Sequence, residues 1–312
     1  MFRHTLQKTL SSHHLAIAIA LIFGVSCMQT QNNVEDKIFV HGHRGWRGAY
    51  PENTEVGFIA AFNSGVDALE LDVVLTADRE VLISHDPFMH HEICSYPDLS
   101  RINEEDEKSL NIFQMTLDSV KKYKCGIFPH PRFPKQQNIQ TEKPALKATV
   151  EVIRKLALES GKTEPLWNIE IKSEPHWDNL YHPEPLEYAA AFIKCYNKLG
   201  IENNSVIQSF DPRILNELHH LNPQLKLILL SDDAELTSED KLAQLNFVPY
   251  GYSPNFKLID EDCLEYCKKK NMILVAWTVN EEVDIRRMIQ LGVKHIISDY
   301  PDLVMKIRAE QN

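Results

Sequence analysis

Four short segments of the chain carry polar side chains at the ends of apolar runs. They are HGHRG at 41–45, ELD at 70–72, SHDP at 84–87 and NIEIK at 168–172. Side chains two residues apart point to the same face of a β-strand, so Glu70 pairs with Asp72 and Glu170 pairs with Lys172. Acidic side chains are rarely buried in strands unless they are paired or bind something. The four segments together therefore predict a site with acid–base and cation chemistry.

The acidic members of this set are suited to a hard divalent cation. Glu70, Asp72 and Glu170 offer only oxygen ligands, which Ca²⁺ and Mg²⁺ prefer and which are less typical of zinc sites. We therefore expect one divalent cation, Ca²⁺ or Mg²⁺, at these three carboxylates.

The basic members of the set fit the hydrolysis of a phosphate diester. Such a reaction needs a base for the nucleophile, an acid for the departing alkoxide and positive charge for the phosphate oxygens. His43 and His85 are suited to the two proton transfers, because imidazole changes charge near neutral pH. Arg44 and Lys172 are suited to the phosphate oxygens, Arg44 through a bidentate fork and Lys172 as a point charge.

Each segment taken alone has a simpler explanation. A His-Arg pair in a turn is commonly surface charge, Glu170 and Lys172 could form an ion pair, and the HDP sequence could cap a helix or turn. It is the ordered set that favours a site. Four further histidines are expected to be exposed or hydrogen-bonded within the fold: His41, His90, His91 and His130.

Short apolar or β-branched runs alternate with longer amphipathic stretches from residue 37 onward, which is typical of a parallel sheet with crossover helices. The nine expected strands are 38–41, 67–74, 81–84, 167–171, 206–209, 226–230, 248–252, 273–278 and 295–298. The expected helices span 54–63, 145–158, 185–198, 212–221, 260–269 and 281–291, with Asn53 and Asp211 as N-caps. In a β/α barrel the active site forms at the carboxyl ends of the strands, where the polar segments lie.

Nine strands are one too many for an eight-stranded barrel, and residues 75–80 are too few for a crossover between parallel strands. We therefore expect a hairpin that turns near 77–79, which would bring Asp72 close to His85. The polar stretch 89–143 is long for a connection in a compact domain, and we interpret it as an insertion over the active face. One short helix is expected within it, at 116–123.

The sequence resembles the glycerophosphodiester phosphodiesterases. The matching segments are HRGWRGAYPENTEVGFIAAFNSGVDALELDVVLTADREVLISHDP at 43–87, NIEIK at 168–172, QSFDP at 208–212, AWTVN at 276–280 and ISDYPD at 297–302. The resemblance implies an irregular (β/α)8 barrel of the TIM type, with an inserted segment after the third strand. The barrel domain would span 37–312 and the insertion about 89–143.

The resemblance also implies roles for residues in this chain. His43 and His85 would be the acid and base, Glu70, Asp72 and Glu170 the metal ligands, and Arg44 and Lys172 the phosphate contacts. Glu52 of the PENT sequence would lie near the metal or support its ligands. Trp277 would be an aromatic side chain near the substrate, although core packing at a strand end explains it equally well. Three matching positions have less defined roles: Gln208, Phe210 and Asp299, the last of which could simply cap the following helix.

The reaction expected from the resemblance is metal-dependent hydrolysis of a small glycerophosphodiester to glycerol 3-phosphate and an alcohol. A related phospholipase that acts on membrane lipids is one alternative, and a non-catalytic exported binding protein is another. The segment MHHEICSYPDLSRINEEDEK after His85 lacks the short consensus that commonly follows this histidine in the family. Because loop residues choose the alcohol, the sequence leaves the head group open.

The N-terminal residues indicate the cellular location of the protein, and its overall charge indicates a class of partner that it does not bind. Residues 1–27 combine a weakly basic start with the apolar run LAIAIALIFGV and a Ser-Cys pair, which predicts an export signal with a lipoprotein box. Lipidation of Cys27 would be the one membrane link, in the bacterial periplasm or at the outer membrane.

A formal charge of −11 makes nucleic acid an unsuitable partner. The remaining cysteines are scattered, and we expect neither a disulfide framework nor a zinc site from them.

Overall fold

The computed structural model describes residues 37–311 together with Met1, and the compact unit of the chain begins at Ile38. The predicted export signal and the predicted lipidation of Cys27 fall on residues outside the described part, and both remain predictions. Within the described residues, no helix combines the length and the apolar character needed to cross a membrane.

Eight parallel strands close into a barrel, which confirms the predicted fold class. In the order of their pairing they are β1 (Phe39–Gly42), β11 (His295–Ser298), β10 (Ile273–Ala276), β9 (Gly251–Pro254), β8 (Leu227–Ser231), β7 (Ser205–Ser209), β6 (Leu166–Ile171) and β2 (Ala68–Leu75). The ring closes because β2 also pairs with β1, with Ala68 opposite His41. Each barrel strand is short and buried on both faces, as expected for parallel strands covered by helices.

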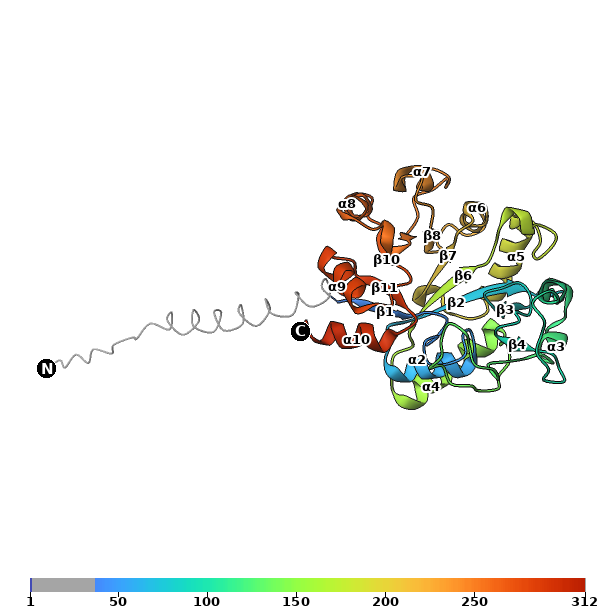
Figure 1. Ribbon diagram of the computed structural model, residues 1–312. Helices are drawn as coiled ribbons and strands as arrows, with labels where there is room; N and C mark the ends of the chain where they lie inside the picture. Colours follow the sequence, from blue (N-terminus) through green and yellow to red (C-terminus); the bar gives the residue numbers. More distant parts are fainter. Residues whose placement is uncertain (2–36, 312) are drawn as a thin grey trace. The chain divides into compact units, whose positions relative to one another are not determined.

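Helices surround the strands, as Figure 1 shows. Those of the barrel are α2 (Glu55–Ser64), α4 (Leu146–Ser160), α5 (Pro185–Tyr196), α6 (Pro212–Leu221), α7 (Ser238–Leu242), α8 (Glu261–Lys269), α9 (Glu282–Leu291) and α10 (Pro301–Ala309). The largest apolar cluster lies between strands and helices, and a smaller one fills the barrel with side chains that include Val206, Ile228, Val275 and Ile297. Asp211 caps α6 as predicted.

The ninth strand is the predicted hairpin partner. Strand β3 (Val81–Ile83) runs antiparallel to the end of β2, with Val73 opposite Ile83 and Leu75 opposite Val81. The backbone N–H of Ser84 then donates to the Asp72 carbonyl at 3.0 Å. The strand that carries the chain toward His85 is therefore an addition to the edge of β2, outside the ring of eight.

Several boundaries differ from the prediction for local reasons. Strand β9 starts at Gly251, three residues later than expected, because only from there does the chain pair with β8 and β10. Thr54, not Asn53, caps α2, since its hydroxyl accepts from the Gly57 N–H. Helix α7 was not predicted from the sequence, and α10 was expected only as the helix that follows Asp299, without bounds.

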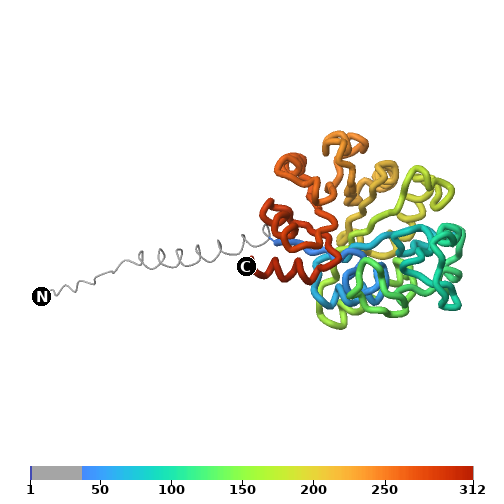
Figure 2. The backbone as a smooth tube through the Cα atoms, viewed as in Figure 1, coloured from blue at the N-terminus to red at the C-terminus, as the bar shows by residue number. Residues whose placement is uncertain are grey.

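The insertion between β3 and α4 forms a small layer of its own. It contains α3 (Leu117–Val120) and a two-stranded pairing of β4 (Cys94–Ser95) with β5 (Lys124–Cys125). In Figure 2 it appears as cyan and green loops on one side of the barrel. Cys94 and Cys125 form a disulfide, which contradicts our expectation that the cysteines would not be bridged. The sequence could not reveal this pair, because 31 residues separate the two cysteines and only the strand pairing brings them together.

The disulfide should stabilise the insertion. Its loop is long enough that replacing Cys94 with Ser is expected to lower the free energy of unfolding by about 2–4 kcal/mol, because the unfolded chain regains the entropy of the open loop. Urea denaturation under non-reducing conditions measures this change. Cys195, which is free and partly exposed, provides the matched control as Cys195→Ser. Equal stability of the two variants would contradict a stabilising role.

Candidate active site

Neighbouring strands bring the three predicted metal carboxylates together inside the barrel. The register of β2 and β6 places Asp72 beside Glu170, and Glu70 lies one pleat deeper on the same face of β2. All three side chains are buried, and one ligand oxygen from each lies within 4.8 Å of the others. The period-2 prediction for ELD and NIEIK therefore describes the observed arrangement.

Crowding of these buried carboxylates changes their affinity for protons. Burial, and then Asp72 and Glu170, raise the pKa of Glu70 well above its usual value. Burial is also the main reason that the pKa of Glu170 rises to about 7, against the opposing effect of Lys172. Burial alone would raise the pKa of Asp72, but Arg44, His85 and Lys172 outweigh it and hold that pKa below its usual value.

The cluster has the properties of a cation site. Its Asp72 Oδ1 is a buried oxygen without a hydrogen-bond partner in the described structure, and Lys172 Nζ lies 4.0 Å from it. An all-oxygen set with an unused ligand atom fits Ca²⁺ or Mg²⁺, which accept carboxylate oxygens.

A second group of possible ligands, His90, His91 and Glu107, already uses several of its polar atoms in hydrogen bonds within the fold. His91 Nδ1 contacts Glu107 Oε2 at 2.6 Å, and His90 Nδ1 accepts from the Glu92 N–H at 3.2 Å. These histidines are hydrogen-bonded within the fold, as predicted.

The loop after β1 carries Arg44 into the site in an unusual backbone conformation. Arg44 and Gly45 both have positive φ, at 48° and 88°. A Cβ on Gly45 would lie 2.8 Å from the Gly57 carbonyl carbon at the start of α2, so this close approach requires glycine. The Arg44 backbone N–H donates to Glu70 Oε2 at 2.9 Å, and Arg44 Nη1 donates to Glu52 Oε1 at 2.7 Å. Glu52 therefore fixes the position of the Arg44 guanidinium, and Glu52 does not itself line the cavity.

His43 is oriented by a carboxylate from the far end of the chain. Its Nδ1 lies 2.6 Å from Asp299 Oδ1, and Asp299 Oδ2 accepts from Asn280 Nδ2 at 2.8 Å. The remaining His43 nitrogen, Nε2, lies 3.9 Å from Glu70 Oε2. Burial lowers the pKa of His43, although Asp299 acts in the opposite direction. The ring is therefore fixed with Nε2 toward the carboxylate cluster.

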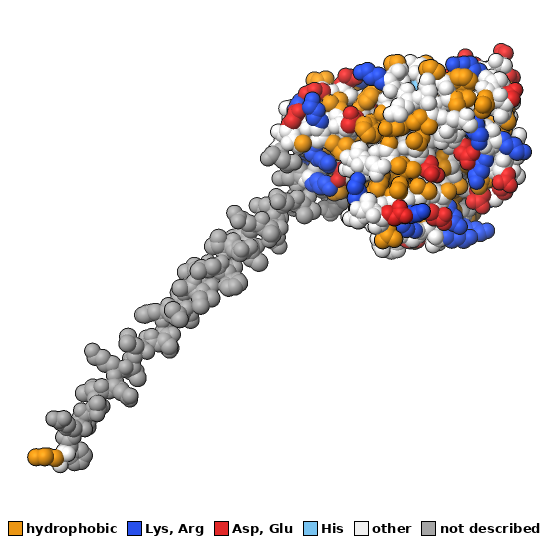
Figure 3. All heavy atoms as spheres, turned by 90° about the horizontal axis from the view of Figure 1, so that it is seen from below, with side chains coloured by type: hydrophobic (Ala, Val, Ile, Leu, Met, Phe, Trp, Pro, Cys, Tyr) orange, Lys and Arg blue, Asp and Glu red, His pale blue; other side chains and the backbone are white. Residues whose placement is uncertain are grey.

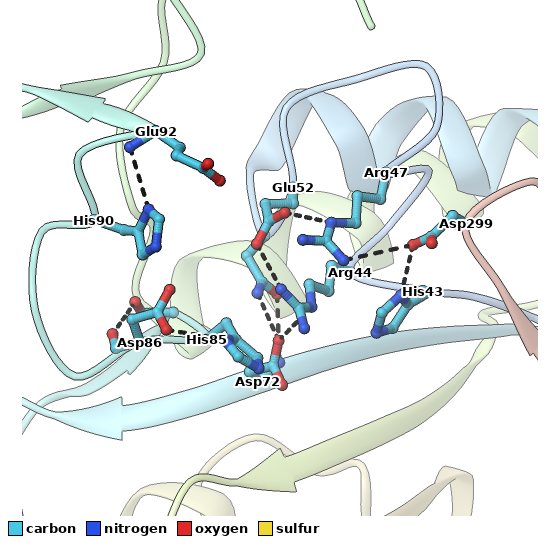
Figure 4. A network of polar contacts seen from close by, with 12 residues as sticks. His43, Arg44, Arg47, Glu52, Asp72, His85, Asp86, His90, Glu92 and Asp299 are labelled. Atoms are coloured by element: carbon cyan, nitrogen blue, oxygen red, sulfur yellow. Dashed lines mark hydrogen bonds and ion pairs between the residues drawn. The ribbon is translucent and has the colours of Figure 1, made fainter. Parts of the chain in front are cut away.

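His85 is held in a similar way by its neighbour in sequence. Its Nδ1 contacts Asp86 Oδ1 at 3.1 Å, and burial, with Arg44 and Lys172, lowers the pKa of His85 to about 4. Figure 4 shows His43 and His85 on either side of Arg44 and Asp72. The two imidazoles therefore flank the carboxylates, each with a carboxylate behind it.

These groups open into a cavity of about 660 Å³ at the carboxyl ends of the strands. The predicted residues that line it are His43, Arg44, Glu70, His85, Glu170, Lys172 and Trp277, together with Gln208 and Phe210. Trp277 is fixed by a hydrogen bond from Nε1 to the Ser253 carbonyl and packs edge-to-face against Phe210. It contacts the smaller apolar cluster as well, so core packing is shown, and its contact with a substrate stays a prediction.

Sequence reasoning missed several supporting residues. Asp299 orients His43. From the sequence, Asp299 could have been no more than the cap of the following helix, but the N-cap residue of α10 is Tyr300. Asp86 supports His85, and its place directly after that histidine was the available signal. Asn53 donates to Asp72 Oδ2 at 2.7 Å in place of capping α2. His130 is buried and its Nδ1 accepts from the Arg132 N–H at 3.1 Å, in agreement with the expectation that it would be exposed or hydrogen-bonded. Its Nε2 has no hydrogen-bond partner among the described residues.

Comparison with known proteins agrees with this arrangement. The model of the glycerophosphoryl diester phosphodiesterase family matches residues 43–303. The chain belongs to this family. A glycerophosphodiester phosphodiesterase from Caldanaerobacter subterraneus subsp. tengcongensis is 30% identical, over 87% of this chain and 98% of the relative.

Solved structures of glycerophosphodiester phosphodiesterases share the fold. A crystal structure from Silicibacter pomeroyi, of a candidate member of the family, has a TM-score of 0.77 and 27% identity, and covers 88% of this chain and 94% of that one. A phosphodiesterase from Oleispira antarctica, in complex with the product sn-glycerol-3-phosphate, has a TM-score of 0.68 at 20% identity over 87% of this chain and 96% of that one. The latter likeness concerns the barrel alone.

The raised carboxylate pKa values predict that cation binding tightens as pH rises from about 6 to 8. Below pH 7 the Glu170 carboxyl holds a proton that a cation must displace, and Glu70 does so over a wider range. Protonation of these buried carboxyl groups stabilises the metal-free fold at low pH. By the same linkage, this stabilisation is lost as pH rises through about 7. Calorimetric titration with Ca²⁺ or Mg²⁺ in buffers of different ionisation enthalpy measures both affinity and proton release. The Glu170→Gln variant should release fewer protons, and a pH-independent affinity in the native chain would contradict the linkage.

Proposed function

We propose that this glycerophosphodiester phosphodiesterase hydrolyses small glycerophosphodiesters to glycerol 3-phosphate and an alcohol. His43 and His85 act as general acid and base, and one divalent cation, Ca²⁺ or Mg²⁺, is held by Glu70, Asp72 and Glu170. Arg44 and Lys172 bind the phosphate oxygens, and Trp277 contacts the substrate.

One observation carries this proposal: two oriented imidazoles and the cations Arg44 and Lys172 face the same cavity as the carboxylate cluster. Each histidine has Nδ1 on a carboxylate, which leaves Nε2 for the substrate side. A nucleophile and a leaving group on opposite sides of one phosphorus atom need such a pair. Charged side chains of both signs are interspersed on the face seen in Figure 3. Positive charge for a phosphate is available within the cavity from Arg44 and Lys172.

The groups of this chain divide the chemistry among them. The bound cation supplies Lewis-acid polarisation of the phosphoryl oxygens. Arg44 is fixed by Glu52 and Asp72, so its position is set before the substrate arrives. One imidazole takes the proton of the attacking hydroxyl at Nε2, and the other delivers a proton to the oxygen of the departing alcohol. Asp299 and Asp86 hold the rings in the tautomer that these transfers need.

We also propose that the protein is exported, with a lipid on Cys27 as its link to the membrane. The Cys94–Cys125 disulfide supports an oxidising compartment, because reducing compartments keep such pairs as thiols. The bacterial periplasm or the outer membrane meets this requirement.

A soluble substrate is favoured over a membrane lipid. The apolar side chains that could have formed a lipid-facing rim are covered: Phe133 is buried, and Phe113, Ile127 and Phe128 are half-buried. Phe128 stacks beneath the Arg101 guanidinium. Hydrolysis of glycerophosphocholine should therefore exceed hydrolysis of phosphatidylcholine vesicles, and the opposite order would favour the phospholipase alternative.

Removing either imidazole tests the catalytic assignment. The variants His43→Ala and His85→Ala should each lower kcat by at least about a hundredfold, the usual contribution of a positioned acid or base. Asp299→Asn should give a smaller loss, because His43 stays present but less well oriented. His220→Ala, which changes an exposed histidine on α6, is the matched control. Near-native turnover in both imidazole variants would refute the assignment, whereas binding of the diester without product would support a non-catalytic binding protein.

Removing the cation tests the metal assignment separately. Treatment with EDTA should abolish hydrolysis of glycerophosphocholine, and Ca²⁺, Mg²⁺ or Mn²⁺ added singly should restore it to different extents. Glu170→Gln should need more cation for half-maximal activity, because it loses a charged ligand. Glu174→Gln is the control, since Glu174 lines the cavity outside the carboxylate cluster. Full activity in the presence of EDTA would exclude a metal-dependent reaction.

A further inference from the structure

Arg47 is a second guanidinium in the active-site cavity that the catalytic assignment leaves unused. It belongs to the loop between β1 and α2, it is 5% exposed, and it lines the cavity with His43 and Arg44. Its Nε is bound to Glu52 Oε2. Its Nη2 is buried without a hydrogen-bond partner in the described part of the chain, and its Nη1 lies 4.0 Å from Asp299 Oδ1. The open end of the guanidinium fork is thus beside the His43–Asp299 pair.

The charges around Arg47 leave it incompletely compensated. Glu52 is shared, since Oε1 accepts from Arg44 and Oε2 from Arg47. Figure 4 shows this carboxylate between the two guanidinium groups. Burial, and then Arg44 and Arg47, set the pKa of Glu52, with the two cations holding it well below its usual value. Arg44 also pairs with Asp72 at 3.2 Å, whereas Arg47 has Glu52 at hydrogen-bond distance and Asp299 only at 4.0 Å. A buried guanidinium with an unpartnered Nη group is costly unless a ligand completes its contacts.

The insertion holds the Arg47 loop in place through residues 130–137, the segment HPRFPKQQ. The Arg47 guanidinium lies 4.8 Å from the Phe133 ring centroid. Gln136 Nε2 donates to the Arg47 carbonyl at 2.8 Å, and the Gln137 N–H donates to the Ala49 carbonyl at 2.9 Å. His130 Nε2 lies 3.8 Å from Glu52 Oε2. Four residues of one segment thus contact the loop or its carboxylate.

We infer that Arg47 binds a non-bridging phosphate oxygen of the substrate next to Arg44, and that the segment 130–137 holds it there. An anion at this position would use the Nη groups of Arg47 that Glu52 leaves free. Guanidinium groups bind phosphate through such a fork, whereas an ammonium group does not. This inference deepens the proposed function, because it assumes a phosphate group in the cavity.

Binding of sn-glycerol 3-phosphate and of inorganic phosphate to the full, cation-loaded chain tests the inference without measuring turnover. Isothermal titration calorimetry should show that Arg47→Gln weakens the affinity for both anions by at least about tenfold, because charge-assisted hydrogen bonds are lost. Arg47→Lys keeps the charge but not the fork, so it should bind more weakly than the native chain and more tightly than Arg47→Gln. Phe133→Ala should weaken binding by a smaller factor, since Arg47 remains but loses its support.

Controls separate this result from general charge and folding effects. Lys135→Gln removes one positive charge from the same segment at an exposed position, and it should leave the affinity unchanged. Should Arg47→Gln fail to fold, as judged by thermal denaturation, Arg47→Lys must still weaken binding. The inference would be overturned if Arg47→Gln bound the anions with native affinity, or if Arg47→Lys did so when it is the only variant that folds. It would also be overturned if the native chain bound neither anion. A native chain that binds the anions but hydrolyses no diester would overturn the proposed function alone.

Discussion

Repulsion among three buried carboxylates is the constraint around which the site is organised. Glu70, Asp72 and Glu170 lie together because two adjacent parallel strands carry them on one face. Burial, and then the negative charge of the neighbouring carboxylates, raises the pKa values of Glu70 and Glu170. The same negative charge explains the cations that surround the cluster. Arg44 approaches from one side through the left-handed turn before Gly45, and Lys172 contacts Glu170 at 2.7 Å from the other. A barrel mouth is suited to this arrangement, since it collects the ends of several strands at one point.

The elements of the fold that depend on local periodicity could be predicted from the sequence. The alternation within ELD and NIEIK fixed which side chains point inward, and the five residues between β2 and β3 were too few for anything but a hairpin. The start of β9 was predicted three residues too early, because the apolar residues before Gly251 lead to the sheet without pairing in it.

What escaped prediction depends on contacts between distant parts of the chain. Nothing near Asp299 in the sequence indicates that it would meet His43 from the neighbouring strand end. Cys94 and Cys125 become neighbours only when β4 pairs with β5. Asn53 has the residue type of a helix cap, but a positive φ turns it toward Asp72, and Thr54 takes its place. Such outcomes follow from loop conformation, which has no periodic signal in the sequence.

The two ends of the insertion lie side by side, with Leu82 bridged to Ala145 and the Ile83 N–H bonded to the Pro144 carbonyl. A segment whose entry and exit adjoin can lengthen, shorten or be exchanged without altering the ring of eight strands. The residues near its entry and exit include His85 and Lys143, yet its interior reaches the loop of Arg47. Divergence among relatives could therefore change the segment that holds the Arg47 loop, while the three carboxylates on β2 and β6 stay where the barrel puts them.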